Sequence, residues 1–213
     1  MTDAVFFDFG GVFIPSPFAA MGAAAERLGM AEADLVAAVF GPYDVDTDHP
    51  WHRLERGELS FDDARTEIGD LSEASGLVRL DPLVALADLA VGHTVRDFMV
   101  DAVRDLRARG IRTGVITNNI AEFGTTWRAM IPVDELFDDI VDSSSVGVRK
   151  PDAAIYLLAC ERLGVEPSAS LFIDDFQGNV DGAHAAGLRG VCCGYSVEST
   201  RAALADLLVL IDQ

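Results

Sequence analysis

The chain has 213 residues, half of them hydrophobic, and its formal net charge at pH 7 is −19. So acidic a surface repels phosphate backbones and anionic lipids, which excludes nucleic acid and membrane surfaces as expected partners. The sequence shows no secretory signal, and no apolar run approaches the roughly 18 residues that a membrane span needs, so we expect a cytoplasmic protein. The three cysteines, Cys160, Cys192 and Cys193, form no disulfide or zinc pattern, and we expect them to be buried and reduced.

Five short apolar segments predict buried strands, at residues 4–7, 113–116, 139–141, 171–173 and 191–193, of which the third is the weakest. Most are continuous apolar runs rather than alternating ones, as is typical of a parallel sheet that is covered on both faces. Helical patterns separate the later strands: one runs from Val95 to Leu106, one begins at Pro151, and one includes residues 183–186. This alternation predicts an α/β fold with a doubly wound parallel sheet and right-handed crossovers.

The first two predicted strands are separated by about a hundred residues, although a crossover needs only a dozen or so. Helical patterns fill this interval after Pro15-Ser16-Pro17, at residues 18–28, 31–40, from near Ser60 with Asp63 in a capping-box position, and 83–90. Residues 92–94 then return the chain to the sheet. We therefore expect an all-helical domain, residues 15–93, inserted into an α/β core formed by residues 1–14 and 94–213.

Polar residues follow four of the predicted strands, at the edge of the sheet where open α/β folds bind ligands. A carboxylate cluster suits Mg²⁺, which proteins usually hold with one or two carboxylates together with a substrate phosphate. A lysine in the same place can offset the remaining negative charge. The residues at the strand ends are Asp8, then Thr117, Asn118 and Asn119, then Lys150, and finally Asp174 and Asp175.

This ordered set of motifs resembles the haloacid dehalogenase superfamily of hydrolases, and the helical insert resembles its first (C1) type of cap. The resemblance covers essentially the whole chain. The motifs look most like one branch of the superfamily, which includes sugar-phosphate phosphatases, such as glucose-1-phosphate phosphatases, and the phosphatase domain of bifunctional epoxide hydrolases. The matching segments are Asp8-Phe-Gly10-Gly-Val, Thr117-Asn118, Arg-Lys150-Pro-Asp with Ile-Tyr after it, and Phe-Ile-Asp174-Asp175 with Asn-Val and Gly-Leu after it.

The resemblance implies a Mg²⁺-dependent phosphatase that acts on a small phosphorylated metabolite. Asp8 is the implied nucleophile and forms an aspartyl-phosphate, with Thr117, Lys150 and Asp175 completing the catalytic set. Gly11, Asn118 and Asn119 are the implied substrate-binding residues. The implied metal ligands are Asp8, the backbone carbonyl of Gly10, Asp174 and Asp175.

Gly10 departs from the family pattern, in which this position carries an aspartate that acts as general acid and base. Positioned proton transfer contributes on the order of 10²–10⁴-fold to a rate. One hypothesis keeps the phosphatase, with a leaving group that needs little protonation or with His52, Tyr43, Asp175 or a water as the substitute. A second is a 2-haloacid dehalogenase with Asp8 as nucleophile, because halide leaves without a proton; the resemblance argues against it, since those enzymes lack the Asp174-Asp175 pair. A third is a weakly active or non-catalytic binding protein on the same scaffold.

Substrate choice is expected to lie in the insert, which closes over the site. The segment from Trp51 to Gly57 resembles one that is common in such caps, and its Arg53 and Arg56 are candidates to contact a sugar or a carboxylate. The alternative is a solvated helix with Trp51 packed in the cap core. Phe13 and Phe18 are candidates to line the pocket. The sequence is compatible with a monomer or a homodimer.

Overall fold

The computed structural model describes residues 2–86, 94–124 and 126–213. Five parallel strands form a sheet in the order β3-β2-β1-β4-β5. Their bounds are β1 Ala4–Phe7, β2 Arg112–Thr117, β3 Asp139–Asp142, β4 Ser170–Asp174 and β5 Arg189–Cys192. All five predicted strands are confirmed, including the weak third one, with ends that differ by at most two residues. The predicted doubly wound α/β fold is therefore confirmed.

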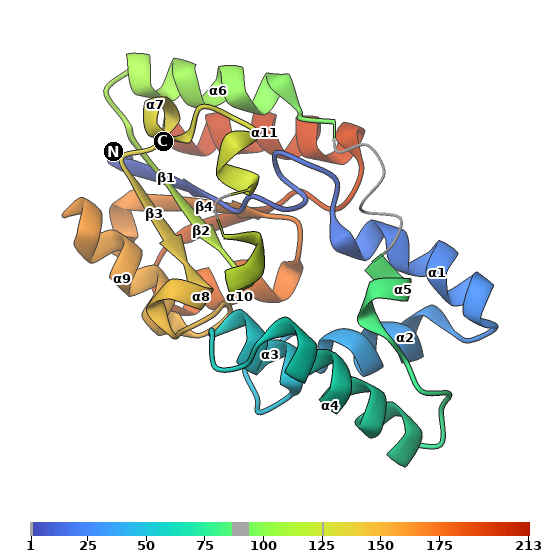
Figure 1. The fold of residues 1–213 in the computed structure, drawn as a ribbon. Coiled ribbons are helices and arrows are strands. Elements are labelled where there is room, and N and C mark those ends of the chain that lie inside the picture. The colour runs from blue at the N-terminus through green and yellow to red at the C-terminus, as the bar shows by residue number, and fades with distance from the viewer. Residues whose placement is uncertain (1, 87–93, 125) are drawn as a thin grey trace.

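Helices cover both faces of the sheet (Figure 1). On one face lie α6 (Asp97–Ala108) and α11 (Val197–Ile211), and on the other lie α9 (Ala153–Leu163) and α10 (Gln177–Ala185). Successive residues of β1 serve the two faces: Val5 and Phe7 pack in the cluster that includes α6 and α11, and Ala4 and Phe6 pack in the cluster of α9 and α10. A strand that is buried on both sides has no polar face, which explains the continuous apolar runs in the sequence.

Helix α11 was not predicted from the sequence. Shorter elements connect the helices and strands. They are α7 (Val133–Leu136), α8 (Ser143–Val146) and the 3₁₀ turns η1 (Pro17–Ala20), η3 (Ala121–Phe123), η4 (Trp127–Ala129) and η5 (Pro167–Ala169). The helix predicted from Pro151 begins two residues later, at Ala153. Asp152 is its N-cap, because the Asp152 side chain accepts a hydrogen bond from the N–H of Ala154 at 2.8 Å. Pro151 therefore lies outside the helix.

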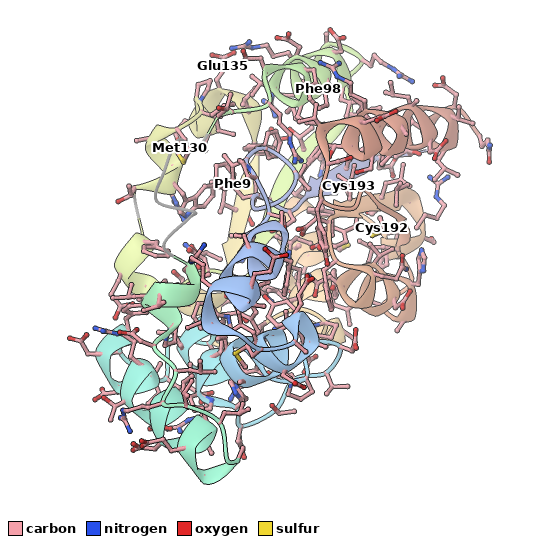
Figure 2. All side chains as sticks on the ribbon, turned by 90° about the vertical axis from the view of Figure 1, so that its right-hand side faces the viewer. Phe9, Phe98, Met130, Glu135, Cys192 and Cys193 are labelled. Atoms are coloured by element: carbon pink, nitrogen blue, oxygen red, sulfur yellow. The ribbon has the colours of Figure 1, made fainter. Side chains whose placement is uncertain are left out.

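The segment between β1 and α6 contains a separate group of helices at one end of the sheet, which we call the cap (Figure 1). These are α1 (Met21–Leu28), α2 (Glu32–Phe40), α3 (Pro50–Glu55), α4 (Phe61–Ala74) and α5 (Pro82–Leu86). They share an apolar core that includes Leu35, Leu54 and Ile68. Figure 2 shows the same separation from the side, with Phe98 and Cys193 in the α/β core and the cap helices beneath it.

The part of the insert that the structure describes is helical. The end of the helix expected at residues 83–90 and the return at residues 92–94 fall largely outside the described residues, so the domain limits 15–93 stay a prediction. Ser60 caps α4, since its hydroxyl accepts the N–H of Asp63 at 3.2 Å and donates to the Asp63 carboxylate at 2.6 Å. Within the described ranges, no helix has both the length and the apolar character to cross a bilayer.

Candidate active site

Asp8 directly follows β1, the central strand, where the strand order reverses between β2 on one side and β4 on the other. Phe7 pairs with Val115 of β2 and with Ile173 of β4. The carboxyl ends of all three strands therefore reach the same edge of the sheet. This edge is the switch point at which open α/β sheets bind their ligands.

Lys150 joins two of the predicted carboxylates. Its Nζ lies 2.8 Å from an oxygen of Asp8 and 2.7 Å from an oxygen of Asp174, and all three side chains are buried. Asp174 also accepts the backbone N–H of Phe176 at 2.8 Å and the side-chain amide of Asn179, 3.1 Å from each carboxylate oxygen. Asp174 is therefore held firmly in place by Asn179, which follows the Asp174-Asp175 pair in the sequence but was not among the predicted site residues.

Asp175 completes a group of three carboxylates, and one of its oxygens, Oδ2, is buried without a hydrogen-bond partner. Asp8, Asp174 and Asp175 each offer an oxygen within 4.8 Å of the others. We call these three residues and Lys150 the catalytic cluster. A buried carboxylate oxygen without a partner is costly, and a cation supplies the missing interaction. The donor set, all hard oxygens, fits Mg²⁺.

Burial first, and the neighbouring negative charges after it, raise the pKa values of two carboxyl groups in this cluster. Burial raises the pKa of Asp8 to about 7; the ammonium of Lys150 opposes this rise, and the nearby Asp174 adds to it. Burial, followed by the charge of Asp174, holds the pKa of Asp175 well above its usual range. One ammonium thus faces three carboxylates, and it does not balance them.

The two glycines after Asp8 differ in what surrounds them. Gly11 has a φ of +72°, and a Cβ there would overlap the carboxylate of Asp175, so this position requires glycine. A Cβ on Gly10 would find only the Cδ of Pro17 within 4 Å, at an ordinary contact distance of 3.8 Å. Packing against the described residues therefore does not require glycine at position 10, and the space is open to a side chain.

The last residue of β2 and the two residues after it make different contacts. Thr117 is buried at the strand end and lines the cavity described below. The side chain of Asn118 accepts the N–H of Lys150 at 2.8 Å and donates to the Lys150 carbonyl at 3.1 Å. Asn119 donates to the carboxylate of Asp142 at 2.9 Å. Both side-chain amides thus hold neighbouring loops in place, although both residues also border the cavity.

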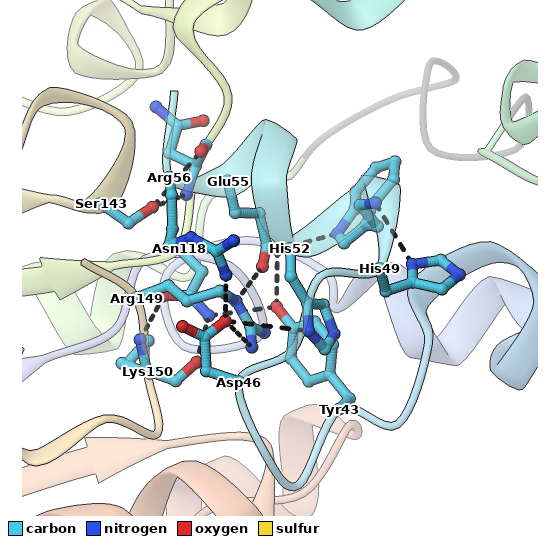
Figure 3. A network of polar contacts seen from close by, with 12 residues as sticks. Tyr43, Asp46, His49, His52, Glu55, Arg56, Asn118, Ser143, Arg149 and Lys150 are labelled. Carbon is cyan, nitrogen blue, oxygen red and sulfur yellow. Dashed lines mark hydrogen bonds and ion pairs between the residues drawn. The ribbon is translucent and has the colours of Figure 1, made fainter. Parts of the chain in front are cut away.

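A second buried charge cluster joins the cap to the core (Figure 3). The carboxylate of Glu55 accepts hydrogen bonds from the hydroxyl of Tyr43 at 2.7 Å, the indole of Trp51 at 2.8 Å and Nε of Arg149 at 2.7 Å. The guanidinium of Arg149 lies over the ring of Tyr43, 4.6 Å from its centre. We call these four residues the cap–core network.

The cap–core network was not predicted. Glu55 lies in the cap segment that contains Arg53 and Arg56, and Arg149 lies in the Arg-Lys-Pro-Asp motif. The two partners are 94 positions apart in the sequence, so no local pattern relates them. Burial alone would lower the pKa of Arg149, but the charge and hydrogen bond of Glu55, together with Tyr43, outweigh burial, and the pKa lies above its usual value. Because Arg149 precedes Lys150, the network ties the cap to the loop that carries the lysine.

A cavity of about 530 Å³ lies between the core and the cap. Asp8, Gly10, Thr117, Lys150 and Asp175 form one end of it, and most of the remaining wall is apolar. The apolar lining comprises Phe9, Ile14, Pro15, Pro17, Phe18, Phe40, Trp51, Phe61, Leu83, Leu86, Ile120, Phe123, Trp127 and Met130. Of the predicted pocket residues, Phe18 lines the cavity, whereas Phe13 is buried in the core of the α/β domain.

The two cap arginines that were candidates for substrate contact lie elsewhere. Arg53 pairs with Glu67 at 2.8 Å, and Arg56 pairs with Glu58 at 2.7 Å, and neither lines the cavity. Trp51 packs in the cap core, as the alternative interpretation held, and also borders the cavity. The arginine expectation is therefore wrong for this structure. His52, a candidate acid, is buried in the cap, where its Nδ1 accepts the N–H of Thr47 at 3.0 Å.

Comparison with curated proteins finds several relatives. The chain is 31% identical over 159 residues to phosphatase MT3486 of Mycobacterium tuberculosis, covering 70% of this chain and 73% of that protein. It is 29% identical over 191 residues to acyl-CoA dehydrogenase family member 10 of Mus musculus, covering 88% of this chain but 17% of the mouse protein. It is 26% identical over 151 residues to phosphoglycolate phosphatase of Escherichia coli O157:H7, covering 68% of this chain and 59% of that enzyme. The chain therefore spans only part of the length of these relatives.

Solved structures share the fold. A HAD family enzyme of Bacteroides thetaiotaomicron, in complex with magnesium and inorganic phosphate, superposes with a TM-score of 0.62 at 17% identity, covering 92% of this chain and 96% of that one. The L-2-haloacid dehalogenase RSc1362 superposes with a TM-score of 0.66 at 19% identity, covering 100% and 99%. Identities this low establish the fold and leave the reaction open. The sequence model of the haloacid dehalogenase-like hydrolase family matches residues 2–187. The chain therefore belongs to this family.

Proposed function

We propose that this protein is a Mg²⁺-dependent phosphatase that hydrolyses a small phosphate monoester through an aspartyl-phosphate on Asp8. The observation that carries the proposal is the catalytic cluster, in which three buried carboxylates lie around a single ammonium and one oxygen of Asp175 lacks a partner. Bound Mg²⁺ would balance this charge and polarise the phosphoryl group. Asp8, Asp174, Asp175 and the carbonyl of Gly10 are the residues that would hold it.

Each residue then has a defined part in the reaction. A carboxylate oxygen of Asp8 forms a bond to phosphorus while the bond from phosphorus to the leaving oxygen breaks, and the electron pair departs with that oxygen. Thr117 donates a hydrogen bond to a phosphoryl oxygen. Two N–H groups of Lys150 are committed to Asp8 and Asp174, which leaves its third for the phosphoryl group. Water then attacks the aspartyl-phosphate, which releases phosphate and restores Asp8.

Gly10 leaves the first step without a proton donor at this position. The leaving oxygen must therefore depart as an anion and take its proton from water. A phenol or another weakly basic leaving group suffers least from this loss, because it is stable as an anion. The second step also lacks a base, so the aspartyl-phosphate is expected to break down slowly.

The test is phosphate release from a panel of monoesters, assayed with MgCl₂ and with excess EDTA. The proposal predicts release with Mg²⁺ and none with EDTA, and an increase of the unfolding midpoint as MgCl₂ is added. For the midpoint, Asp175→Asn should reduce the increase, while Asp152→Asn, at an exposed helix cap, should leave it unchanged. Chloride release from a 2-chloro acid without metal, with no phosphate release from any ester, would instead support the dehalogenase.

A further inference from the structure

The cavity beside the catalytic cluster is much larger than inorganic phosphate requires. Its volume of about 530 Å³ lies within the range of roughly 300–1,000 Å³ that is typical of sites for whole small molecules. The ionised groups occupy one end, and the cavity extends from there between the core and the cap. The remainder of the space is therefore available to the group that carries the phosphate.

Buried aromatic rings form the central part of the wall. On the core side, the rings of Phe9 and Trp127 lie 4.5 Å apart. On the cap side, Phe40 lies 5.0 Å from Phe18 and 4.9 Å from Trp51. All five side chains are buried and hold each other in place. Figure 2 shows Phe9 on the loop after β1, on the core side of the junction with the cap.

Several of the polar groups along this wall are already engaged with other residues of the protein. The hydroxyl of Tyr43 donates to Glu55, and the amide of Asn118 is bonded to the backbone of Lys150. The indole N–H of Trp127 and the side-chain oxygen Oδ1 of Asn179 have no partner, so they offer a donor and an acceptor. Among the described residues that line the cavity, Lys150 is the only cation, and it faces the carboxylates.

This environment discriminates between the leaving groups of phosphate esters. The hydroxyls of a sugar would lose water and find too few partners, and an unpaired buried polar group is costly. A carboxylate, as in phosphoglycolate, would need a second cation that the described wall does not offer. An apolar group would be favoured by about fourfold for every methylene that it buries.

Resting on the proposed phosphatase activity, we infer that the substrate is the phosphate ester of an apolar alcohol or phenol, whose carbon skeleton fills the aromatic cavity. The cap thus selects substrates whose leaving group is a hydrocarbon rather than a sugar or a carboxylate. This class also agrees with the proton donor missing at Gly10 where the alcohol is a phenol.

The test uses two homologous series with MgCl₂ present. In n-alkyl monophosphates from ethyl to octyl, the basicity of the leaving oxygen stays almost constant while the apolar length grows. We expect kcat/KM to rise about three- to fourfold per added methylene until the cavity is full. The Kd of n-alkylphosphonates, which cannot be hydrolysed at that bond, should fall by a similar factor in calorimetry. Glucose 1-phosphate and phosphoglycolate should react at least about 100-fold more slowly than the hexyl ester.

The two readouts separate this inference from the phosphatase proposal. Hydrolysis of all esters with no dependence on chain length overturns the inference and leaves the phosphatase intact. Tighter binding of longer phosphonates, with no hydrolysis of any alkyl or aryl ester, supports the apolar site and overturns the phosphatase. Neither binding nor hydrolysis overturns both.

A substitution at the rim tests the wall directly. Phe123 lines the cavity yet is 54% exposed, so Phe123→Arg should fold and add a cation there. The ratio of kcat/KM for hexyl phosphate to that for phosphoglycolate should fall by about tenfold or more. Leu157→Arg is the matched control, since Leu157 is 46% exposed on α9 and does not line the cavity, and it should leave the ratio unchanged. An unchanged ratio in Phe123→Arg contradicts the inference.

Discussion

Arg149 and Lys150 are neighbours in the chain, and both are fully buried, yet they enter different electrostatic environments. Arg149 enters the cap–core network, where the carboxylate of Glu55 matches its charge and accepts three hydrogen bonds, although Nη2 of Arg149 is buried without a partner. Lys150 enters the catalytic cluster, where it faces three carboxylates, one of them with an oxygen that lacks a partner. A balanced cluster holds parts of a fold together, whereas an unbalanced one calls for a ligand of the opposite charge.

The largest effect is expected from Asp8→Asn. Removing the proposed nucleophile should reduce Mg²⁺-dependent phosphate release on the order of 10⁴-fold or more. The free energy of unfolding at pH 8 without metal should stay the same or increase, because burial raises the pKa of Asp8 to about 7 and the charged form is disfavoured in the folded state. Urea unfolding and a phosphate assay measure the two effects. Full activity, or a clearly less stable variant, would contradict the view that the catalytic cluster carries an unbalanced negative charge for function.

Glu55→Gln should have the opposite effect on stability. The change leaves the charge of Arg149 buried without its counterion, so we expect a loss of about 3–5 kcal/mol in the free energy of unfolding. Arg149→Met added to this variant should recover much of the loss. Glu67→Gln is the control, because it breaks the exposed pair with Arg53 in the same domain and should cost less than about 1 kcal/mol. A loss for Glu55→Gln as small as the control's would show that the network does not join cap and core.

Gly10→Asp adds the proton-transferring carboxyl group that the catalytic cluster lacks at this position. The space around Gly10 admits a side chain, so the variant should fold and accelerate alkyl phosphate hydrolysis on the order of 10²-fold. Aryl esters, whose leaving groups need no proton, should gain less in the first step. Gly10→Asn has the same size and transfers no proton, so it should not accelerate either class. Equal gains from the aspartate and asparagine variants would rule out a proton-transfer role.

The last prediction concerns the pH dependence of stability in the cap. Burial, followed by the charge of Arg149, lowers the pKa of His52 from 6.5 to about 3. The neutral ring is thus favoured in the folded state, so its contribution is complete above pH 6.5 and is lost as the pH falls towards 3. The loss reaches about 1.4 kcal/mol per pH unit. The stability difference between wild type and His52→Asn should therefore shrink between pH 7 and pH 4.

The sequence was sufficient where the signal is local. Strands buried on both faces produce continuous apolar runs, and a polar residue at the end of each run marks the edge of the sheet, so Asp8, Thr117 and Asp174 could be placed together. The pairing of Glu55 with Arg149 and the lining of the cavity depend on how the cap rests on the core, and no local pattern encodes this. For the same reason Arg53 and Arg56 could be considered as candidates for substrate contact, although their carboxylate partners lie within the cap.

The most direct test of the account is to look for the phosphoryl group on Asp8 during turnover. With no base at Gly10, the aspartyl-phosphate formed from an aryl phosphate and Mg²⁺ should accumulate, and rapid acid quenching should preserve it. Mass spectrometry of the quenched protein should find one phosphoryl group on the peptide that contains Asp8, and none in Asp8→Asn or in the presence of EDTA. Rapid phosphate release with no phosphoryl group on Asp8, or release that persists in Asp8→Asn, would contradict the central claim.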